Sequence, residues 1–326
     1  MQVKGHVLIL VGGGGHAGYA YALAQALHDK MKLSFIVPEG DKLSEKRLKK
    51  FGQVKFLIKP RGPKTSTQQF IPRLAKSFIK SLGQPFTEFD VVVSSGSNFC
   101  VVPSIMAWMR GVPVVSMESP VRFTKASRTA RILQNFAAVT ALHWEEQKKI
   151  LKGTVVGPIF PNVEVTPENQ GYILVTGGTH GHKLLFKALD ESNLTNVVLQ
   201  TGKNDPKPFA ERHPEWKVLD FTDKFQELIA GAEVVVTHFG LTALEAAVVY
   251  KKPVVIVLNP EWTRTVGAED AKIFAKKLNA VFISESTVET LTNAIAEAKT
   301  KKPLNLPSGA ENLANIIADL VNKKRK

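Results

Sequence analysis

Ile9-Leu10-Val11-Gly12-Gly13-Gly14-Gly15-His16 is matched 164 positions later by Ile173-Leu174-Val175-Thr176-Gly177-Gly178-Thr179-His180, with six of eight positions identical. Each copy is a short apolar run that ends in glycines and precedes an amphipathic stretch, which predicts a strand, a tight turn and a helix start. Such a turn suits phosphate, because free backbone N–H groups and the helix dipole converge there. Two copies half a chain apart predict an α/β protein with two Rossmann-like, doubly wound parallel-sheet domains that face each other across a cleft.

The two halves echo each other again beyond these turns. Asp90–Ser94 and Glu233–Thr237 are apolar runs, and each precedes a small-residue turn, a helical stretch and a Pro-Val-Val strand. Strands that alternate with helices predict parallel sheets with helices on both faces. We therefore expect one domain over residues 1–160, a polar linker and a second domain over residues 168–326. The last predicted helix, 311–321, is a candidate to pack back on the first domain.

The composition is typical of a soluble protein with two ordinary domains. The 326 residues are 44% hydrophobic and 22% charged. The one cysteine, Cys100, excludes a disulfide framework and favours a reducing compartment, and its apolar neighbours predict a buried structural thiol. We expect neither a targeting segment nor a spanning helix, because no apolar run approaches the roughly 20 residues that a bilayer requires.

Positive charge is concentrated in the first half of the chain. Residues 1–165 hold 23 Lys and Arg against 10 Asp and Glu, a net charge of +13, whereas residues 166–326 hold 20 against 19. This asymmetry favours an anionic partner: nucleic acid, an acidic membrane or a phosphate-bearing substrate. The competing interpretation is a lysine-rich surface of the thermophile kind. Nucleic acid ranks last, because the basic residues are not interleaved with stacking aromatics.

Three turns of the first half carry polar residues where predicted strands end. His16 opens a helix whose dipole disfavours the imidazolium, so it is either a neutral general base or a helix-capping histidine. Ser94–Asn98 follows a buried strand and directs its side chains and amides to the same edge. Glu118 and Arg122 are either a site pair or a simple strand-end ion pair. No acidic residue completes a dinucleotide fingerprint, which disfavours a nicotinamide enzyme.

The second half offers hydrogen-bond donors that suit a pyrophosphate. Thr176–Gly181 supplies backbone amides and hydroxyls. Thr237–Glu245 leads into a helix predicted at about 242–249, which Thr242 is a candidate to cap. Glu245 either chelates two sugar hydroxyls or is an acid in the first helical turn with no ligand.

Taken in order, these motifs resemble those of the inverting GT-B N-acetylglucosaminyltransferases. The set comprises a Gly-Gly-His turn, a Ser-Gly turn, Glu-Ser-x-x-Arg, Val-Thr-Gly-Gly-Thr, Thr-His-x-Gly and Thr-x-x-Glu. The chain looks like a fusion, in an archaeal form, of the two subunits that add the second N-acetylglucosamine (GlcNAc) to the lipid-linked oligosaccharide of N-glycosylation. The bacterial transferase that forms lipid II is a more distant relative. The resemblance covers most of the chain. No single motif is specific to the family, whereas the order of the whole set is fairly specific.

The resemblance implies a role for each half. The first would bind a lipid pyrophosphate acceptor, with His16 as the first choice of base and Glu118 as the second. Its acceptor-binding candidates are Gly14, Gly15, Ser95, Gly96, Asn98 and Arg122. The second would bind the donor UDP-GlcNAc. Its donor-binding candidates are Thr176, Gly177, Gly178, Thr179, His238, Gly240, Thr242, Glu245, Glu269 and Asp270.

Three features depart from the family pattern. The stretch from Gly240 to Glu245 is one residue short. Asp270-Ala271 stands where the family often has His-Gln, so Glu269 or Asp270 would have to contact the donor sugar. The membrane helix of the eukaryotic anchor-type subunit is absent.

A predicted helix over residues 68–82 could supply the missing membrane contact. Its apolar residues recur at helical spacing with basic residues between them, and we expect Pro72 in its first turn. It is either an interfacial membrane helix or an ordinary helix packed on the core, and the lipid acceptor favours the first. The membrane-contact candidates are Phe70, Ile71, Leu74, Lys76, Phe78 and Lys80.

The implied reaction is one in-line displacement at the anomeric carbon, with inversion and release of UDP. GlcNAc-pyrophosphate-dolichol is the expected acceptor, and amides at Gly177–Thr179 would stabilise the departing pyrophosphate. No Asp-x-Asp sequence is present, so we expect no obligatory metal and no other cofactor. The protein would lie peripherally on the cytoplasmic face of an anionic membrane. The alternatives are a UDP-GlcNAc 2-epimerase and a non-catalytic nucleotide-sugar-binding or membrane-recruiting subunit; the oligomeric state stays open.

Overall fold

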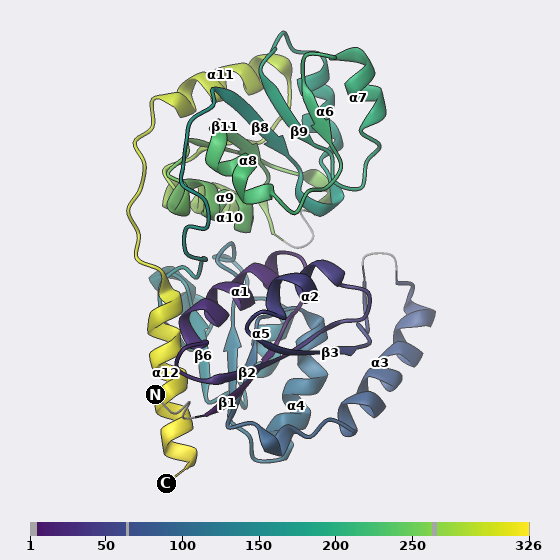
Figure 1. Cartoon of the computed structure of the whole chain (residues 1–326), viewed down its shortest axis with the longest axis vertical. Helices are drawn as coiled ribbons and strands as arrows, with labels where there is room; N and C mark the ends of the chain where they lie inside the picture. The colour runs from purple at the N-terminus through teal and green to yellow at the C-terminus, as the bar shows by residue number, and fades with distance from the viewer. Residues whose placement is uncertain (1–4, 63–64, 263–265, 326) are drawn as a thin grey trace. The chain divides into compact units, whose positions relative to one another are not determined.

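The chain forms two compact units, each with its own sheet (Figure 1). The structure, a computed structural model, describes residues 5–62, 65–262 and 266–325. Unit 1 comprises residues 1–161 together with 307–326, and unit 2 comprises residues 162–306. Within the described ranges, no helix combines the length and apolar content that crossing a bilayer demands.

Unit 1 contains a seven-stranded sheet in the order β3-β2-β1-β4-β5-β6-β7, and all its strand pairs are parallel. The strands are β1 (His6–Leu10), β2 (Lys32–Pro38), β3 (Gly52–Leu57), β4 (Val91–Ser94), β5 (Val114–Met117), β6 (Val139–Leu142) and β7 (Thr154–Val155). The helices are α1 (Gly15–Leu27), α2 (Lys42–Leu48), α3 (Thr67–Leu82), α4 (Val101–Met109), α5 (Arg128–Leu133) and α12 (Gly309–Lys324). Short 3₁₀ turns cover Phe86–Glu88, Asn98–Cys100 and Glu145–Lys149.

Unit 2 repeats this plan with a six-stranded parallel sheet in the order β10-β9-β8-β11-β12-β13. The strands are β8 (Tyr172–Thr176), β9 (Val197–Gln200), β10 (Lys217–Leu219), β11 (Ala232–Thr237), β12 (Val254–Val257) and β13 (Val281–Ile283). The helices are α6 (Lys183–Asp190), α7 (Lys207–Arg212), α8 (Phe225–Gly231), α9 (Leu241–Leu244), α10 (Ala268–Lys277) and α11 (Val288–Lys299). Gly178–His180 and Pro260–Trp262 are 3₁₀ turns, and Glu245–Val249 is a π-helical turn.

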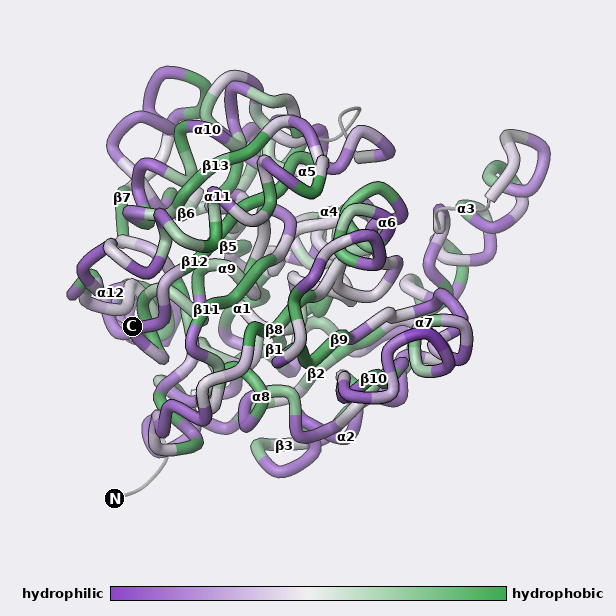
Figure 2. The backbone as a smooth tube through the Cα atoms, turned by 90° about the horizontal axis from the view of Figure 1, so that it is seen from above, coloured by the Kyte–Doolittle hydropathy of each residue, from purple (hydrophilic) through white to green (hydrophobic). Residues whose placement is uncertain are grey.

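The cores lie between each sheet and its helices. Figure 2 shows the hydrophobic colour concentrated along the central strands and polar colour at peripheral loops. Parallel strands buried on both faces read as continuous apolar runs, and Val91–Val93 and Val234–Val236 are fully buried. The predicted α/β fold with two parallel sheets is confirmed, and so is the buried thiol of Cys100.

The C-terminal helix α12 belongs to unit 1 and lies beside α1 (Figure 1). Its residues Leu313, Ile317 and Val321 are fully buried. Arg325, just after the helix, pairs with Asp90 at 2.8 Å, and Lys324 donates to the carbonyl oxygen of Phe89 at 2.8 Å. The last helix thus completes the core that the first 161 residues begin.

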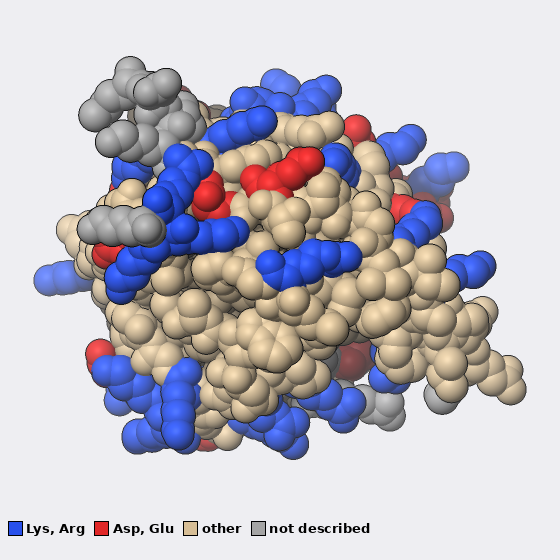
Figure 3. All heavy atoms as spheres, turned by 90° about the horizontal axis from the view of Figure 1, so that it is seen from below, with Lys and Arg blue, Asp and Glu red and all other residues tan. Residues whose placement is uncertain are grey.

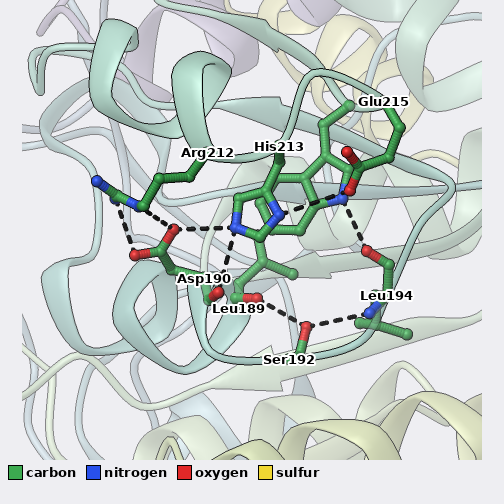
Figure 4. Close-up of polar contacts among 8 residues, drawn as sticks. Leu189, Asp190, Ser192, Leu194, Arg212, His213 and Glu215 are labelled. Carbon is green, nitrogen blue, oxygen red and sulfur yellow. Dashed lines mark hydrogen bonds and ion pairs between the residues drawn. The ribbon is translucent and has the colours of Figure 1, made fainter.

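A polar cluster joins the C-terminal ends of α6 and α7 in unit 2 (Figure 4). His213 Nε2 lies 3.0 Å from Asp190 Oδ1, and Arg212 Nη2 lies 2.8 Å from the other oxygen of that carboxylate. The imidazole also stacks on Trp216 with 3.6 Å between ring centroids. Because these contacts join the end of α6 to the end of α7 and to the segment that follows it, we assign the cluster a structural role.

Two local predictions were wrong. Pro72 lies in the second turn of α3, because the helix begins at Thr67 behind a capping box formed by Ser66 and Gln69. Thr242 is not an N-cap: Gly240 takes that position without a side-chain hydrogen bond, and the expected helix over 242–249 becomes α9 followed by the π-helical turn. The sequence analysis also overlooked the short elements β7, β10, β13 and α7.

Candidate active site

The glycine turns lie where the strand order of each sheet reverses. β1 is flanked by β2 and β4, and β8 is flanked by β9 and β11. In open parallel sheets, ligands bind outside the carboxyl ends of the strands at such a reversal. The parallel pairing brings the loops after β1, β4 and β5 to one edge of unit 1, and the loops after β8, β11 and β12 to one edge of unit 2. We describe each edge by itself.

His16 lies in the first turn of α1, directly after the glycine turn of unit 1. Its Nδ1 is 2.8 Å from the carbonyl oxygen of Ser95. A carbonyl oxygen can only accept a hydrogen bond, so Nδ1 carries the proton and Nε2 presents its lone pair. This is the tautomer that a general base needs. The bond ties the imidazole to the loop after β4 rather than to the start of its own helix.

Two glycines allow this close approach. A Cβ at Gly96, whose φ is +96°, would lie 2.8 Å from both Cε1 and Nδ1 of His16. A Cβ at Gly12 would lie 2.6 Å from the carbonyl oxygen of Gly96. Cys100 donates from Sγ to that same carbonyl at 2.8 Å, so the buried thiol supports the turn that holds the imidazole.

Burial keeps His16 neutral. It lowers the pKa of the imidazole to about 4, with the positive charges of Lys59 and Arg122 acting in the same direction and the Ser95 carbonyl opposing them. The sequence analysis predicted a neutral ring but attributed it to the helix dipole; desolvation is the main cause. The residue as a whole is nevertheless partly exposed, beside the exposed Gly14 and Gly15.

Glu118 holds a loop in place. Its carboxylate accepts hydrogen bonds from the amides of Ser119 and Ser127, each at 2.7 Å, and its side chain is buried. Burial raises the pKa of this carboxyl, while the two amides and Arg122 oppose the shift. Arg122 donates to the carbonyl of Lys125 at 3.4 Å and acts on Glu118 electrostatically. We therefore favour His16 over Glu118 as the base.

The remaining acceptor candidates differ in what they offer a ligand. Gly14 and Gly15 are exposed, and a Cβ at Gly14 would meet nothing within 4 Å. Ser95 is buried, and its hydroxyl accepts from the amide of Gly12 at 3.0 Å, so it shapes the turn from inside. Asn98 is exposed and donates to the carbonyl of Arg61 at 3.1 Å.

The sequence analysis missed two residues at this edge. Lys59, after β3, donates from Nζ to the carbonyl oxygen of Gly12 at 2.9 Å. His143, after β6, donates from Nε2 to the carbonyl of Glu118 at 2.8 Å and accepts at Nδ1 from the amide of Ile159 at 3.2 Å. The stretch Lys59-Pro60-Arg61-Gly62 is part of the family resemblance but had no role assigned to it, whereas nothing local distinguishes His143.

The glycine turn of unit 2 is folded tightly on itself. A Cβ at Gly177 would lie 2.3 Å from the backbone of Gly181, so only glycine fits there. The buried hydroxyl of Thr176 donates to Gln200 at 2.8 Å and accepts from the amide of Gly178 at 3.0 Å. One amide that we expected to face the pyrophosphate is thus already engaged. Thr179, by contrast, is exposed at the outside of the turn.

His238 packs directly on this turn. Its Cε1 would lie 2.8 Å from a Cβ at Gly178, whose φ is +65°. Burial lowers the pKa of His238 to about 4, with His182 and His180 acting in the same direction. Its Nδ1 is buried and has no hydrogen-bond partner among the described residues. A neutral ring with a free nitrogen beside the turn fits a donor-binding role.

Glu245 begins the π-helical turn, and its side chain is buried. Insertions of this kind often occur at functional sites, because they redirect a side chain within a helix. Gly240 and Thr242 precede it at the same strand edge and are partly exposed. Glu269 and Asp270 lie in the first turn of α10, the first exposed and the second buried.

The predicted membrane helix, α3, presents an apolar surface. Ile71 is 67% exposed, Phe78 is 42% exposed, and Lys76 and Lys80 are also exposed. Leu74 differs from the prediction, because it is partly buried against the core of unit 1. Phe70 is also partly buried, with the guanidinium of Arg61 5.8 Å from its ring centroid.

The exposed apolar surface extends beyond this helix. On α4, which contacts α3, Trp108 is 49% and Met109 is 67% exposed. Figure 3 shows one face of the molecule on which Lys and Arg side chains far outnumber acidic ones around a broad uncharged area.

Two family models match the chain, one in each half. Residues 7–159 match the oligosaccharide biosynthesis protein Alg14 like family, and residues 172–323 match the glycosyltransferase family 28 C-terminal domain. The second match extends over α12, which the structure places in unit 1. Together the two matches span nearly all of the chain.

Eight curated relatives share one name. The "UDP-N-acetylglucosamine--N-acetylmuramyl-(pentapeptide) pyrophosphoryl-undecaprenol N-acetylglucosamine transferase" of Myxococcus xanthus is 26% identical over 96% of this chain and 93% of its own length. The enzyme of that name from Trichodesmium erythraeum is 28% identical over 70% of this chain and 66% of its own length.

Solved structures share the fold. MurG of Acinetobacter baumannii aligns with a TM-score of 0.66 and 18% identity, covering 97% of this chain and 99% of that one. The UDP-GlcNAc 2-epimerase of Neisseria meningitidis, bound to UDP-GlcNAc, aligns at 0.61 and 15% identity, covering 98% and 100%. The fold is therefore GT-B. The chain thus combines an Alg14-like N-terminal half with a C-terminal half of the glycosyltransferase family 28 type.

Proposed function

We propose that this glycosyltransferase transfers GlcNAc from UDP-GlcNAc, with inversion, to a lipid-pyrophosphate-linked sugar. The observation that carries the proposal is the geometry of His16. Its Nδ1 proton is committed to the Ser95 carbonyl, and its neutral ring leaves Nε2 able to accept a proton beside an exposed glycine turn. Such a group can deprotonate an acceptor hydroxyl as that hydroxyl attacks the anomeric carbon.

Unit 2 supplies the donor site in this proposal. The turn Thr176–Thr179 would face the pyrophosphate, His238 and Gly240 would lie by the nucleotide, and Glu245 would hold the ribose. The departing UDP gains negative charge, which the fixed dipoles of the turn can stabilise without rearrangement. Because the Gly178 amide is occupied by Thr176, we assign the pyrophosphate contacts to the outer part of the turn, at Thr179.

Unit 1 supplies the acceptor site and the membrane contact. Gly14, Gly15, Gly96, Asn98 and Arg122 would surround the acceptor, with Ser95 shaping the turn from inside. The apolar residues of α3 and α4 would enter the interface of an anionic membrane, with Lys76 and Lys80 on its head groups. We propose a peripheral location on the cytoplasmic face, where a nucleotide sugar and a lipid-linked acceptor meet.

The Alg14-like half favours GlcNAc-pyrophosphate-dolichol as the acceptor, which would make the product chitobiose for N-glycosylation in an archaeal setting. The relatives' shared name indicates a different acceptor, a muramyl-pentapeptide on undecaprenyl pyrophosphate. The choice between them is a choice of acceptor sugar and lipid within one reaction class. We further propose that no metal ion is required.

The test is transfer from radiolabelled UDP-GlcNAc to synthetic phytanyl-pyrophosphate-GlcNAc, with the muramyl-pentapeptide acceptor in a parallel reaction. We expect a lipid-linked disaccharide with a β linkage from the first acceptor and unchanged turnover in EDTA. Product only from the muramyl acceptor would overturn the acceptor assignment. Formation of UDP-N-acetylmannosamine without any lipid-linked product would overturn transfer in favour of epimerisation.

A further inference from the structure

Lys59 is a partly buried cation at the edge of unit 1 where we propose that the acceptor binds. The reaction proposed above assigns it no role. It follows β3, which pairs with β2. In the sheet, β2 lies between β3 and β1, the strand that precedes the glycine turn. Its Nζ donates to the carbonyl oxygen of Gly12 at 2.9 Å and would lie 3.8 Å from a Cβ at Gly13. The ammonium is therefore held against the turn that precedes His16.

The ammonium of Lys59 donates to a neutral backbone oxygen, and the carboxylate near it is that of Asp41, whose Oδ2 would lie 3.1 Å from the same Cβ at Gly13. The acid that acts on it electrostatically is Asp41, whose two oxygens accept from the amide and hydroxyl of Ser44 at 3.2 and 2.7 Å. Burial lowers the pKa of Lys59, which reflects the cost of holding this charge away from water. An anionic ligand at the turn would offset that cost, since a partly desolvated charge gains most from a charged partner.

The backbone around Lys59 connects the turn with the proposed membrane helix. Arg73, on α3, donates from Nε to the carbonyl oxygen of Lys59 at 3.3 Å. Two residues further along, the carbonyl of Arg61 accepts from Asn98 in the loop after β4. A lipid acceptor has to extend from the membrane helix to His16, and Lys59 lies between these two parts of the unit.

We propose that Lys59 binds the diphosphate of the lipid-linked acceptor and thereby sets the distance between the membrane surface and the sugar presented to His16. This inference deepens the proposed function and rests on it. The contact is one charge-assisted hydrogen bond to a phosphate oxygen, made while the ammonium remains against the Gly12 carbonyl. It makes the enzyme selective for a diphosphate bridge between lipid and sugar.

The test compares two acceptors that differ by one phosphate: phytanyl-diphosphate-GlcNAc and phytanyl-monophosphate-GlcNAc. We would measure kcat/KM for both with the full-length protein, with Lys59→Met, with Lys59→Arg and with the control Lys55→Met, which alters a lysine within β3. Loss of a hydrogen bond between charged groups predicts a fall of about 10- to 100-fold in the preference of Lys59→Met for the diphosphate. Lys59→Arg should recover part of that preference, and Lys55→Met should match the wild type.

A structural role for Lys59 predicts a different pattern, because a distorted turn would lower kcat/KM for both acceptors equally. An unchanged preference in Lys59→Met would therefore overturn the proposal, and so would a rise in the KM for UDP-GlcNAc, which would mean that the lysine serves the donor.

If the wild type transfers to neither acceptor, the proposed function fails instead. Equilibrium binding of phytanyl diphosphate in detergent micelles then still tests Lys59: weaker binding to Lys59→Met supports the contact, and equal binding refutes it.

Discussion

Gly96→Ala tests whether the position of the imidazole controls the reaction. The new Cβ would lie 2.8 Å from two atoms of the His16 ring, whereas ordinary contacts begin at 3.4 Å, so the ring has to move by roughly half an ångström. That movement disturbs the hydrogen bond from Nδ1 to Ser95 and redirects Nε2. Because misplacement by 1 Å can cost about 100-fold in rate, we expect kcat to fall about 10- to 100-fold.

Gly111→Ala is the matched control for backbone strain. Gly111 also has a positive φ, of +73°, but a Cβ there would meet nothing within 4 Å. Both variants place alanine in the left-handed region at a cost of about 1–2 kcal/mol, so only the steric contact with His16 distinguishes them.

The assay for both variants is the initial rate of GlcNAc transfer at saturating substrates, with binding of UDP measured by calorimetry on the same samples. We expect both to bind UDP like the wild type and only Gly96→Ala to lose turnover. If Gly96→Ala keeps kcat within twofold, or if Gly111→Ala loses as much, the argument from ring position is refuted.

Four further predictions concern titration, the C-terminal helix, the membrane surface and the donor site. Since burial lowers the pKa of His16 to about 4, the neutral base persists down to that pH, and the acid limb of kcat/KM should lie near pH 4 to 5; a limb at 6.5 or above in a pH-rate series would contradict this. Ile317→Ala should lower the free energy of unfolding of unit 1 by about 2–5 kcal/mol in urea titrations, with exposed Asn322→Ala as the neutral control, and a loss confined to unit 2 would refute the placement of α12. The double variant Ile71→Asp/Ile79→Asp should release the protein from anionic vesicles in flotation, and undiminished flotation would exclude this surface of α3. Glu245→Gln should raise the KM for UDP-GlcNAc about tenfold or more while the KM for the acceptor stays constant, and the reverse pattern would reassign that carboxylate.

Periodic apolar patterns were sufficient to predict most of the fold. The apolar runs that begin the two matching stretches are the ends of β1 and β8, as predicted, because a continuous apolar run before a glycine turn is typical of a strand buried on both faces. Elements such as β10 and β13 were missed because each has three residues, too few for a period to be visible. The final helix was recognised, and its place beside α1 rests on contacts far apart in the sequence.

Only part of the candidate site could be predicted from the sequence. His16 was found because a histidine after a glycine turn is a local signal, but the reason for its neutrality is burial, which depends on the loop after β4. Glu118 was also a candidate base, because it follows a predicted strand. In the structure its carboxylate instead accepts two amide hydrogen bonds from the loop that follows it. Its partner Ser127 lies nine residues away across a turn that no periodicity predicts. Lys59 reaches the glycine turn from the end of another strand, so only the folded chain reveals its contact with that turn.

The most direct test of the account is the rate of GlcNAc transfer by His16→Ala, with UDP binding measured on the same preparation. His28→Ala, at the other end of α1 with a side chain that is 40% exposed, is the matched control. Loss of a general base predicts a fall in kcat of about 100- to 10,000-fold with unchanged UDP binding, and a control that turns over like the wild type. A His16→Ala enzyme that transfers GlcNAc at the wild-type rate would contradict the assignment of this imidazole as the base.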